Sequence, residues 1–132
     1  MASDTPPQVQ GLVVYQVFPR NHGPNGRLSD VTADLDRIAA LGVDVVYLLP
    51  IHPIGEEARK GSLGSPFAIR DYRAIHPDLG NEADFADLIE QAHARGLRVI
   101  IDVVFNHTAP DSLLLAEHPD FFRRDATGRP VG

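Results

Sequence analysis

The sequence predicts an α/β fold with a parallel sheet, and three observations lead to that class. Three short apolar runs rich in β-branched residues alternate with two segments of helical periodicity, which gives the order β-α-β-α-β. The third run, within residues 98–108, has the near-continuous apolar character of a strand buried on both faces. The connections are also unequal. A single glycine leads from each helix toward the next strand, whereas residues 50–80 separate the second strand from the second helix.

The first half of the chain contains one predicted strand, one helix and a second strand. The first strand is expected over residues 12–18 and ends before a proline. Ser29 and Asp30 are expected to cap the first helix. Gly42 suits the left-handed residue that ends this helix, and the second strand follows over residues 43–49. The buried stripe of the helix would consist of Val31, Leu35, Ile38 and Leu41.

The second half begins with an irregular connection. Residues 50–80 hold four prolines and four glycines, which exclude a long regular element. Asn81 is expected to cap the second helix, which would end at Gly96 just before the third strand. Beyond Thr108 the chain is rich in proline and charge, with one short apolar piece at 113–115. The buried stripe of the second helix would consist of Phe85, Leu88, Ile89 and Ala92.

The unequal connections place the elaborated loops at the C-terminal ends of the strands. In a (β/α)8 barrel and in an open doubly wound sheet alike, this rim carries the active site. The barrel is favoured because residues 19–23, Pro-Arg-Asn-His-Gly, follow the first strand without the Gly-rich phosphate turn of a dinucleotide fold. The sequence therefore favours a (β/α)8 TIM barrel over an open sheet, and the resemblance described below implies that these elements are the first three β/α units of that barrel.

Charge and composition limit the classes of partner. Lys and Arg number 12 against 18 Asp and Glu, and the resulting net charge of −6 disfavours a nucleic-acid surface. The absence of cysteine excludes disulfides and thiolate metal sites. The N-terminus lacks the basic and apolar regions of a signal peptide, and no apolar run approaches the roughly 20 residues of a membrane span. We therefore expect a cytoplasmic protein that binds neither nucleic acid nor membrane.

The third predicted strand delivers polar side chains to this rim. It contains one carboxylate, Asp102, and it ends at Asn106 and His107. A buried carboxylate without a partner would cost several kcal/mol, on the order of the penalty for an unpaired buried charge. A partner for Asp102 from outside its own strand is therefore expected, which indicates a polar site at the top of the sheet.

The segment Asp102-Val-Val-Phe-Asn-His107 resembles the first signature of the α-amylase superfamily, glycoside hydrolase family 13, which lies at the end of barrel strand 3. Five weaker similarities follow the family order, and the resemblance covers roughly residues 12–130. They are residues 14–19 at strand 1, 41–51 at helix 1 and strand 2, 64–72 in a sugar-subsite loop, 79–85 at helix 2, and 118–122 at the start of domain B. Six motifs in the same order make the assignment specific.

The resemblance implies roles for several side chains. His107 would hydrogen-bond a glucosyl hydroxyl, since a neutral imidazole both donates and accepts, and Asp71 would also contact substrate. Asp102 would pair with an arginine on barrel strand 4, a strand that lies outside this sequence. Tyr72 and Gln16 would support the site. Simpler alternatives stay open: a histidine that caps a strand end, and a carboxylate that tethers a loop.

Two further positions carry an implied role with an open alternative. Phe67 stands where the family usually has a tyrosine stacked on the sugar, so stacking is retained and the hydroxyl is lost; Phe67 could also anchor a loop. Ala68 stands where exo-acting glucosidases often have aspartate, which disfavours that subgroup. Asn106 resembles a calcium ligand that ties domain B to the barrel, yet many members hold no calcium there. No cofactor is required.

The resemblance also implies what these residues lack. Family chemistry follows the retaining two-carboxylate scheme, with carboxylates after strands 4, 5 and 7, beyond the three strands predicted here. We therefore expect an N-terminal lead-in (1–11), a partial barrel (12–108) and the start of domain B (109–132). The parent enzyme would act on an α-glucan or oligosaccharide. The chain alone, without the C-terminal part of its barrel, would be inactive and would self-associate through open strand edges.

Two rival functions remain at this stage. A non-catalytic family member could bind carbohydrate or assist assembly, and the three carboxylates in the downstream sequence would discriminate the two. An unrelated metal-dependent hydrolase would need a His-x-His or a carboxylate after strand 1, where only Arg20-Asn-His22 occurs. His22, His52 and His76 occur singly in loops and are expected at the surface.

Overall fold

A three-stranded parallel sheet forms the centre of the computed structural model, which describes residues 5–131. Its strands are β1 (Val14–Val17), β2 (Val45–Leu48) and β3 (Arg98–Ile101), in the order β1-β2-β3. Val14 pairs with Val45, and Val45 pairs with Arg98. The predicted parallel α/β class is confirmed, with strands shorter than the apolar runs. The predicted lead-in begins with residues 1–4, which lie outside the described residues.

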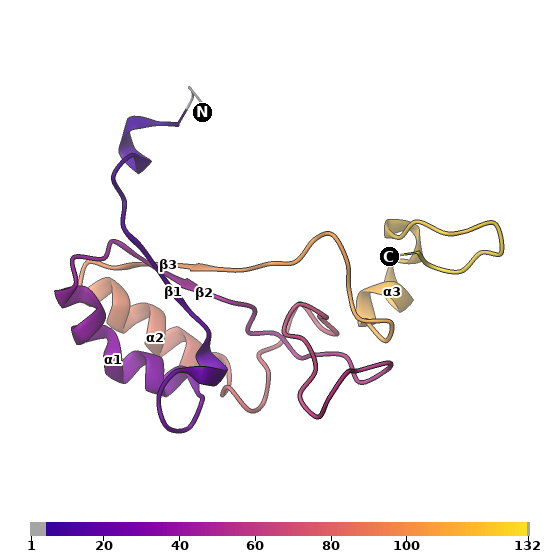
Figure 1. Ribbon diagram of the computed structural model, residues 1–132, viewed down its shortest axis with the longest axis horizontal. Coiled ribbons are helices and arrows are strands. Elements are labelled where there is room, and N and C mark those ends of the chain that lie inside the picture. The colour runs from indigo at the N-terminus through magenta and orange to yellow at the C-terminus, as the bar shows by residue number, and fades with distance from the viewer. Residues whose placement is uncertain (1–4, 132) are drawn as a thin grey trace.

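Two helices of equal length connect the strands, α1 (Leu28–Ala40) and α2 (Glu82–Ala94). Both lie on the same face of the sheet, with α1 and α2 packed side by side (Figure 1). A short helix α3 (Leu113–Glu117) forms from the apolar piece near the C-terminus. No helix within residues 5–131 is long and apolar enough to cross a membrane. Three short 3-10 turns are η1 (Pro7–Val9), η2 (Pro19–Asn21) and η3 (Pro119–Phe121).

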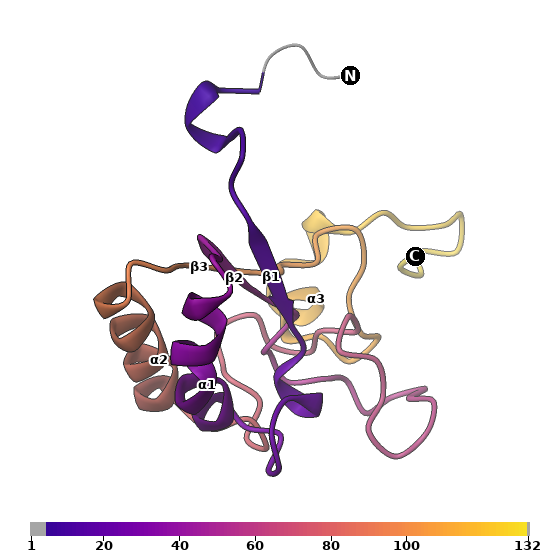
Figure 2. The ribbon, with the colours of Figure 1, turned by 60° about the vertical axis from the view of Figure 1, so that its left-hand side comes forward.

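The loops that follow strands gather at the opposite end of the sheet from the helix-to-strand turns. Figure 2 shows the connection between β2 and α2 beside the segment that carries α3, beyond the C-terminal ends of the strands. Gly42 and Gly96 make the short turns, with φ of 78° and 75°. A side chain at either position would meet no atom within 4 Å, so glycine is favoured there by backbone conformation.

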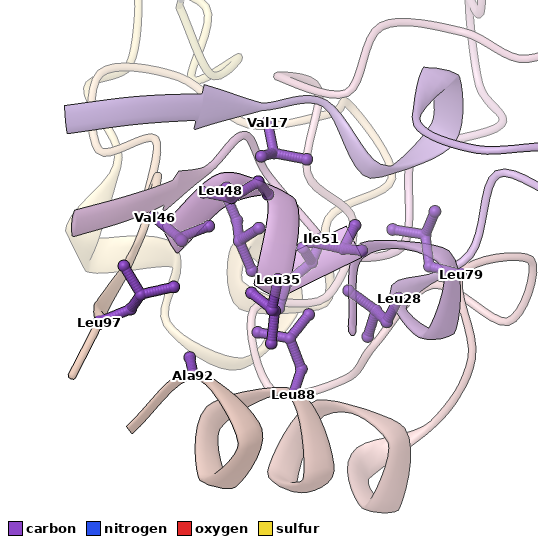
Figure 3. Close-up of a cluster of buried hydrophobic side chains, with 12 residues drawn as sticks. Val17, Leu28, Leu35, Val46, Leu48, Ile51, Leu79, Leu88, Ala92 and Leu97 are labelled. Atoms are coloured by element: carbon purple, nitrogen blue, oxygen red, sulfur yellow. The ribbon is translucent and has the colours of Figure 1, made fainter. Parts of the chain in front are cut away.

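The hydrophobic core lies between the sheet and the two helices, as Figure 3 shows. Leu35 of α1 and Leu88 of α2 are both fully buried against strand residues. The buried members of the cluster are Val17, Leu28, Val31, Leu35, Ile38, Val46, Leu48, Ile51, Leu79, Leu88, Ala92 and Leu97. Most of the predicted α1 stripe therefore belongs to this core. Leu41 was expected there too, but it lies beyond the end of α1 and is 58% exposed.

The opposite face of the sheet carries no helix. Side chains alternate between the faces of a strand, so Gln16, Tyr47 and Ile100, which are in register, share the face away from the helices. Ile100 is 48% exposed, and Phe105 beyond the strand is 91% exposed. The prediction that the third strand is buried on both faces is therefore wrong for this chain, because α1 and α2 cover one face only.

The start of α1 and the start of α2 are each held by a carboxylate at the third helical position. Asn81 caps α2 as predicted: its side-chain oxygen accepts from Asp84 N at 3.1 Å, and Asp84 accepts from Asn81 N at 2.9 Å. In α1 the predicted cap is wrong. The helix begins at Leu28, Ser29 lies inside it, and Asp30 accepts from Arg27 N at 3.0 Å. Sequence alone placed the cap two to three residues late because Asp30 acts from the N3 position.

We expect Asp30→Asn to lower stability at neutral pH. The hydrogen bond from Arg27 N, followed by that from Asn25, lowers the pKa of Asp30 below 3.8. A depressed folded pKa gives stability that is full above the unfolded pKa and is lost as the pH falls through the folded value. Denaturant unfolding should therefore show a lower midpoint for Asp30→Asn at pH 7 and a smaller difference at a pH well below the ordinary pKa of aspartate. Asp87→Asn, at a surface carboxylate with one 3.5 Å contact, is the control; an equal loss at both pH values would contradict the expectation.

Candidate functional site

The carboxylate directly after β3, that of Asp102, has a partner that sequence reasoning missed. Tyr47 donates its hydroxyl hydrogen to Asp102 Oδ2 across 2.7 Å, from the neighbouring strand β2. This hydrogen bond, with a smaller contribution from burial, raises the pKa of Tyr47. The expectation that Asp102 needs a partner outside its own strand is thus met by a tyrosine. The alternation of side chains could have identified it, because Tyr47 and Asp102 both occupy the face away from the helices.

Gln16 lies on that same face but makes no side-chain hydrogen bond within the described part of the chain. It is exposed, and it stands next to Tyr47 in the register of β1 and β2. Gln16 of β1, Tyr47 of β2 and Asp102, which directly follows β3, therefore form a row of polar side chains on the open face, near the C-terminal ends of the strands. Such a row supplies donors and acceptors at the rim where barrel folds bind substrate.

The long connection after β2 is fastened to the segment after β3. Ile54 and Ile69 form an antiparallel bridge within the connection. Ala109 N donates to Ile69 O at 3.0 Å, and Leu113 N donates to Arg70 O at 2.9 Å. These bonds hold two loops, far apart in the sequence, as one layer at the C-terminal end of the sheet.

A partly buried carboxylate strengthens this junction. Asp111 Oδ2 accepts from Glu56 N at 3.0 Å. Burial acts to raise the pKa of Asp111, but backbone hydrogen bonds, including that from Glu56, together with the charge of Arg70, lower it overall. Gly55 packs directly against this group, and a side chain there would clash with Ala109 and Asp111. A glycine is therefore required here by the close approach of the two loops.

Tyr72 connects the same junction to the polar segment. Its hydroxyl donates to Val104 O at 2.7 Å and lies 3.3 Å from His107 O. Burial raises the pKa of Tyr72, which keeps the hydroxyl protonated as a donor. Its neighbour Asp71 accepts from Arg73 N at 2.9 Å, so that carboxylate shapes its own turn. Tyr72 thus holds the backbone on which His107 is carried.

The remaining predicted site residues lie at the surface of this layer. Asn106 and His107 are exposed, and Phe67 is 37% exposed. Among the described residues, no hydrogen bond joins the side chains of these three to one another or to Asp71. The sequence placed them correctly at one end of the sheet, but the structure does not assemble them into a closed pocket.

Among the hollows in the described part of the chain, two lie near the loops, and His107 lines neither of them. A hollow of about 20 Å³ is lined by Asp71, Tyr72, Arg73, Leu113 and Leu114. It is too small for a sugar ring, since ligand pockets measure roughly 300–1,000 Å³. A wider hollow of about 330 Å³ is lined by Arg20, Asn25, Gly26, Arg27, Leu63 and Asp78, none of which was a candidate for the site.

The three loop histidines are less exposed than predicted. His52 is only 7% exposed and its Nδ1 lies 3.1 Å from Ala74 O. His22 pairs with Asp34 at 2.9 Å and keeps 17% of its side chain exposed. Burial lowers the pKa of His76, whose side chain is 18% exposed. The spacing of residues along the sequence could not predict this burial. The histidines occur singly in irregular loops, and the loops pack against one another as a separate layer.

The described residues do not by themselves suit a metal ion. No group of three or more His, Asp or Glu side chains that could hold one occurs within residues 5–131. Asn106 would contribute a single amide oxygen, whereas calcium takes six to eight oxygen ligands. A calcium ion at Asn106 would therefore need most of its ligands from elsewhere.

The fold and the position of its polar residues define a class of protein. Parallel β/α units with elaborated loops and polar side chains at the C-terminal ends of the strands are typical of (β/α)8 barrel enzymes. The family model described as alpha amylase, catalytic domain, matches residues 9–123. The chain belongs to the alpha-amylase family, as its resemblance indicated.

Individual relatives agree with this assignment. An alpha-glucosidase of Pediococcus pentosaceus is 42% identical, over 86% of this chain and 19% of the relative. An alpha-1,4-glucan:maltose-1-phosphate maltosyltransferase of Methylacidiphilum infernorum is 39% identical, over 83% of this chain and 19% of the relative. The chain thus spans about a fifth of the length of these curated relatives.

Solved structures share the fold as well as the sequence. An alpha-amylase from Lactobacillus plantarum superposes with a TM-score of 0.89 at 52% identity, over 92% of this chain and 29% of that chain. A noncanonic maltogenic alpha-amylase from Thermotoga neapolitana gives a TM-score of 0.86 at 40% identity, over 91% of this chain and 29% of that chain. The arrangement of β1 to β3 is therefore that of alpha-amylase barrels.

Proposed function

We propose that this chain supplies the first three β/α units of a (β/α)8 barrel in a retaining glycoside hydrolase or transglycosidase that acts on α-linked glucans. Its part in that enzyme is one wall of a glucosyl subsite. The observation that carries the proposal is the end of β3, where Asp102 is held by Tyr47 and His107 lies exposed at the rim. The catalytic carboxylates would come from later strands.

Each polar residue has a distinct task in this proposal. His107 hydrogen-bonds a hydroxyl of the bound glucosyl unit, and Phe67 offers an apolar ring face to the sugar. Asp102 carries negative charge on the open face, where a cationic side chain of a later strand would complete its pairing. Within this chain, the hydrogen bond from Tyr47 orients that carboxylate, and Gln16 offers a further polar group beside Tyr47.

The supporting features are chemical as well as spatial. The exposed polar atoms at this rim are neutral amides, an imidazole and a carboxylate, which suit a neutral, hydroxyl-rich ligand. The names of the relatives, an alpha-glucosidase and a maltosyltransferase, are consistent with hydrolysis or transfer of α-linked glucose. Calcium at Asn106 stays outside the proposal, because the described residues around it do not form a site.

A hybrid enzyme tests the proposal. Residues 1–132 would replace the matching part of the Lactobacillus plantarum alpha-amylase, which is 52% identical. We expect the hybrid to hydrolyse 4-nitrophenyl α-maltoside and to release the α-anomer, whereas the 132-residue chain alone should show no turnover. His107→Ala in the hybrid should lower kcat/KM by roughly 10- to 100-fold, the effect of losing one substrate hydrogen bond.

A matched control and clear contrary results accompany this test. His93→Ala, at an exposed histidine near the end of α2, should leave kcat/KM unchanged. Turnover by the chain alone, or an active hybrid indifferent to His107→Ala, would refute the proposed division of roles. The gene sequence after residue 132 would separate the enzyme from a non-catalytic binding protein, because only the enzyme needs the three carboxylates.

A further inference from the structure

The backbone that carries His107 has little support of its own. Asp102 N donates to Leu48 O and Ala109 N donates to Ile69 O, and these bonds bracket a segment without regular structure. Between them, the contacts from Tyr72 to Val104 O and His107 O are the only hydrogen bonds found for residues 103–107 within the described chain. The position of the segment therefore depends on where the Tyr72 hydroxyl is held.

A buried histidine stands against the ring of Tyr72. His52 lies in the connection shortly after β2, is 7% exposed, and has its ring centroid 5.9 Å from that of Tyr72 at an angle of 45°. Its Nδ1 donates to Ala74 O at 3.1 Å, because a carbonyl oxygen can only accept. His52 therefore joins the end of β2 to the backbone two residues after Tyr72.

The second nitrogen of His52 makes this placement unusual. In the neutral ring with hydrogen on Nδ1, Nε2 is an acceptor, and it is buried without a partner in the described chain. A leucine or phenylalanine would fill a purely apolar position without leaving a buried polar atom unpaired, which typically costs about 1–3 kcal/mol. A histidine here suggests that the Nδ1 bond contributes something that apolar packing does not.

We infer that His52 is a positioning residue for the Asn106-His107 segment, acting through Tyr72. The bond from Nδ1 to Ala74 O fixes the imidazole, the imidazole limits the Tyr72 ring to one orientation, and the Tyr72 hydroxyl then holds Val104 O and His107 O. This inference rests on the proposed function only in one respect, that the positioned histidine binds substrate. The contacts from His52 through Tyr72 to the segment are present in the chain whatever it binds.

The chain offers a direct reporter for this connection. It contains no tryptophan, and Phe105 lies in the middle of the segment with 91% of its surface exposed, so Phe105→Trp introduces a single tryptophan there, whose fluorescence can be excited selectively. Time-resolved anisotropy then measures nanosecond motion of the segment without any substrate. Phe121→Trp, at a 66% exposed position in η3, is the matched reporter outside the segment.

The expected results separate positioning from general stabilisation. In the Phe105→Trp background, His52→Phe and Tyr72→Phe should each increase the amplitude of nanosecond motion about twofold. The double variant should add nothing further, because both changes break one connection. His52→Asn, which keeps a donor for Ala74 O, should preserve much of the order. The Phe121→Trp reporter should respond to none of these changes.

Other outcomes would overturn the inference. If His52→Phe leaves the segment ordered while Tyr72→Phe loosens it, His52 does not act through Tyr72. If His52→Phe loosens both reporters alike, its role is general packing. Additive effects in the double variant would show two independent supports. An inactive hybrid enzyme would count against the proposed function but would leave these measurements unaffected.

Discussion

Leu48→Ala should destabilise the chain more than any surface change, by about 2–5 kcal/mol. Leu48 is fully buried at the end of β2, where it packs with residues of both helices in the core. Truncation removes apolar contacts and leaves a cavity that the sheet and helices cannot close completely. Domains of this size are typically stable by only about 5–15 kcal/mol, so the loss would be a large part of the total.

A second leucine provides the control for this prediction. Leu41 follows α1 and is 58% exposed, although its spacing suggested a core position. Leu41→Ala should therefore change the free energy of unfolding by less than about 0.5 kcal/mol, the usual range for surface sites. Urea unfolding followed by circular dichroism measures both variants. Equal destabilisation by the two changes would contradict this prediction and show that Leu41 packs in the core.

These two leucines illustrate what periodicity can predict. The spacing of Val31, Leu35 and Ile38 identified the buried face of α1, because those residues lie inside the helix. Leu41 continues the spacing but comes after Ala40, where the helix has ended, and its side chain is 58% exposed. The cap at Asp30 was misplaced for a related reason: side-chain types that cap helices also occur within the first turn.

The positions of the candidate site residues were predictable where they depend on strand ends and not where they depend on loop packing, and the binding roles of these residues stay predictions. Asp102, Asn106 and His107 were placed correctly because the C-terminal ends of parallel strands share one edge. The burial of His52 and its contact with Tyr72 depend on how residues 50–80 fold back, which no periodic pattern encodes. The same limitation applies to tertiary contacts in any irregular segment.

We expect the 132-residue chain to self-associate in solution through the open face and edges of its sheet. Val14 and Ile100 lie on the face opposite the helices and are 52% and 48% exposed, and β1 and β3 are both edge strands. Exposed apolar surface beside unpaired strand edges favours pairing with another copy. Sedimentation velocity should show oligomers whose proportion rises with concentration. A monodisperse monomer at every concentration tested would contradict this expectation.

A charge on that face should reverse the association. Ile100→Glu adds a carboxylate that would be buried at the contact between copies, so we expect a shift to monomer. Leu63→Glu, at a 53% exposed loop position away from the sheet, should not have this effect. In the hybrid enzyme we expect Ile100→Glu to be harmful instead of helpful. Later barrel strands would cover Ile100 there, and the buried glutamate would then destabilise the fold. One substitution that aids solubility in the short chain and impairs the hybrid would identify this face as the barrel interior.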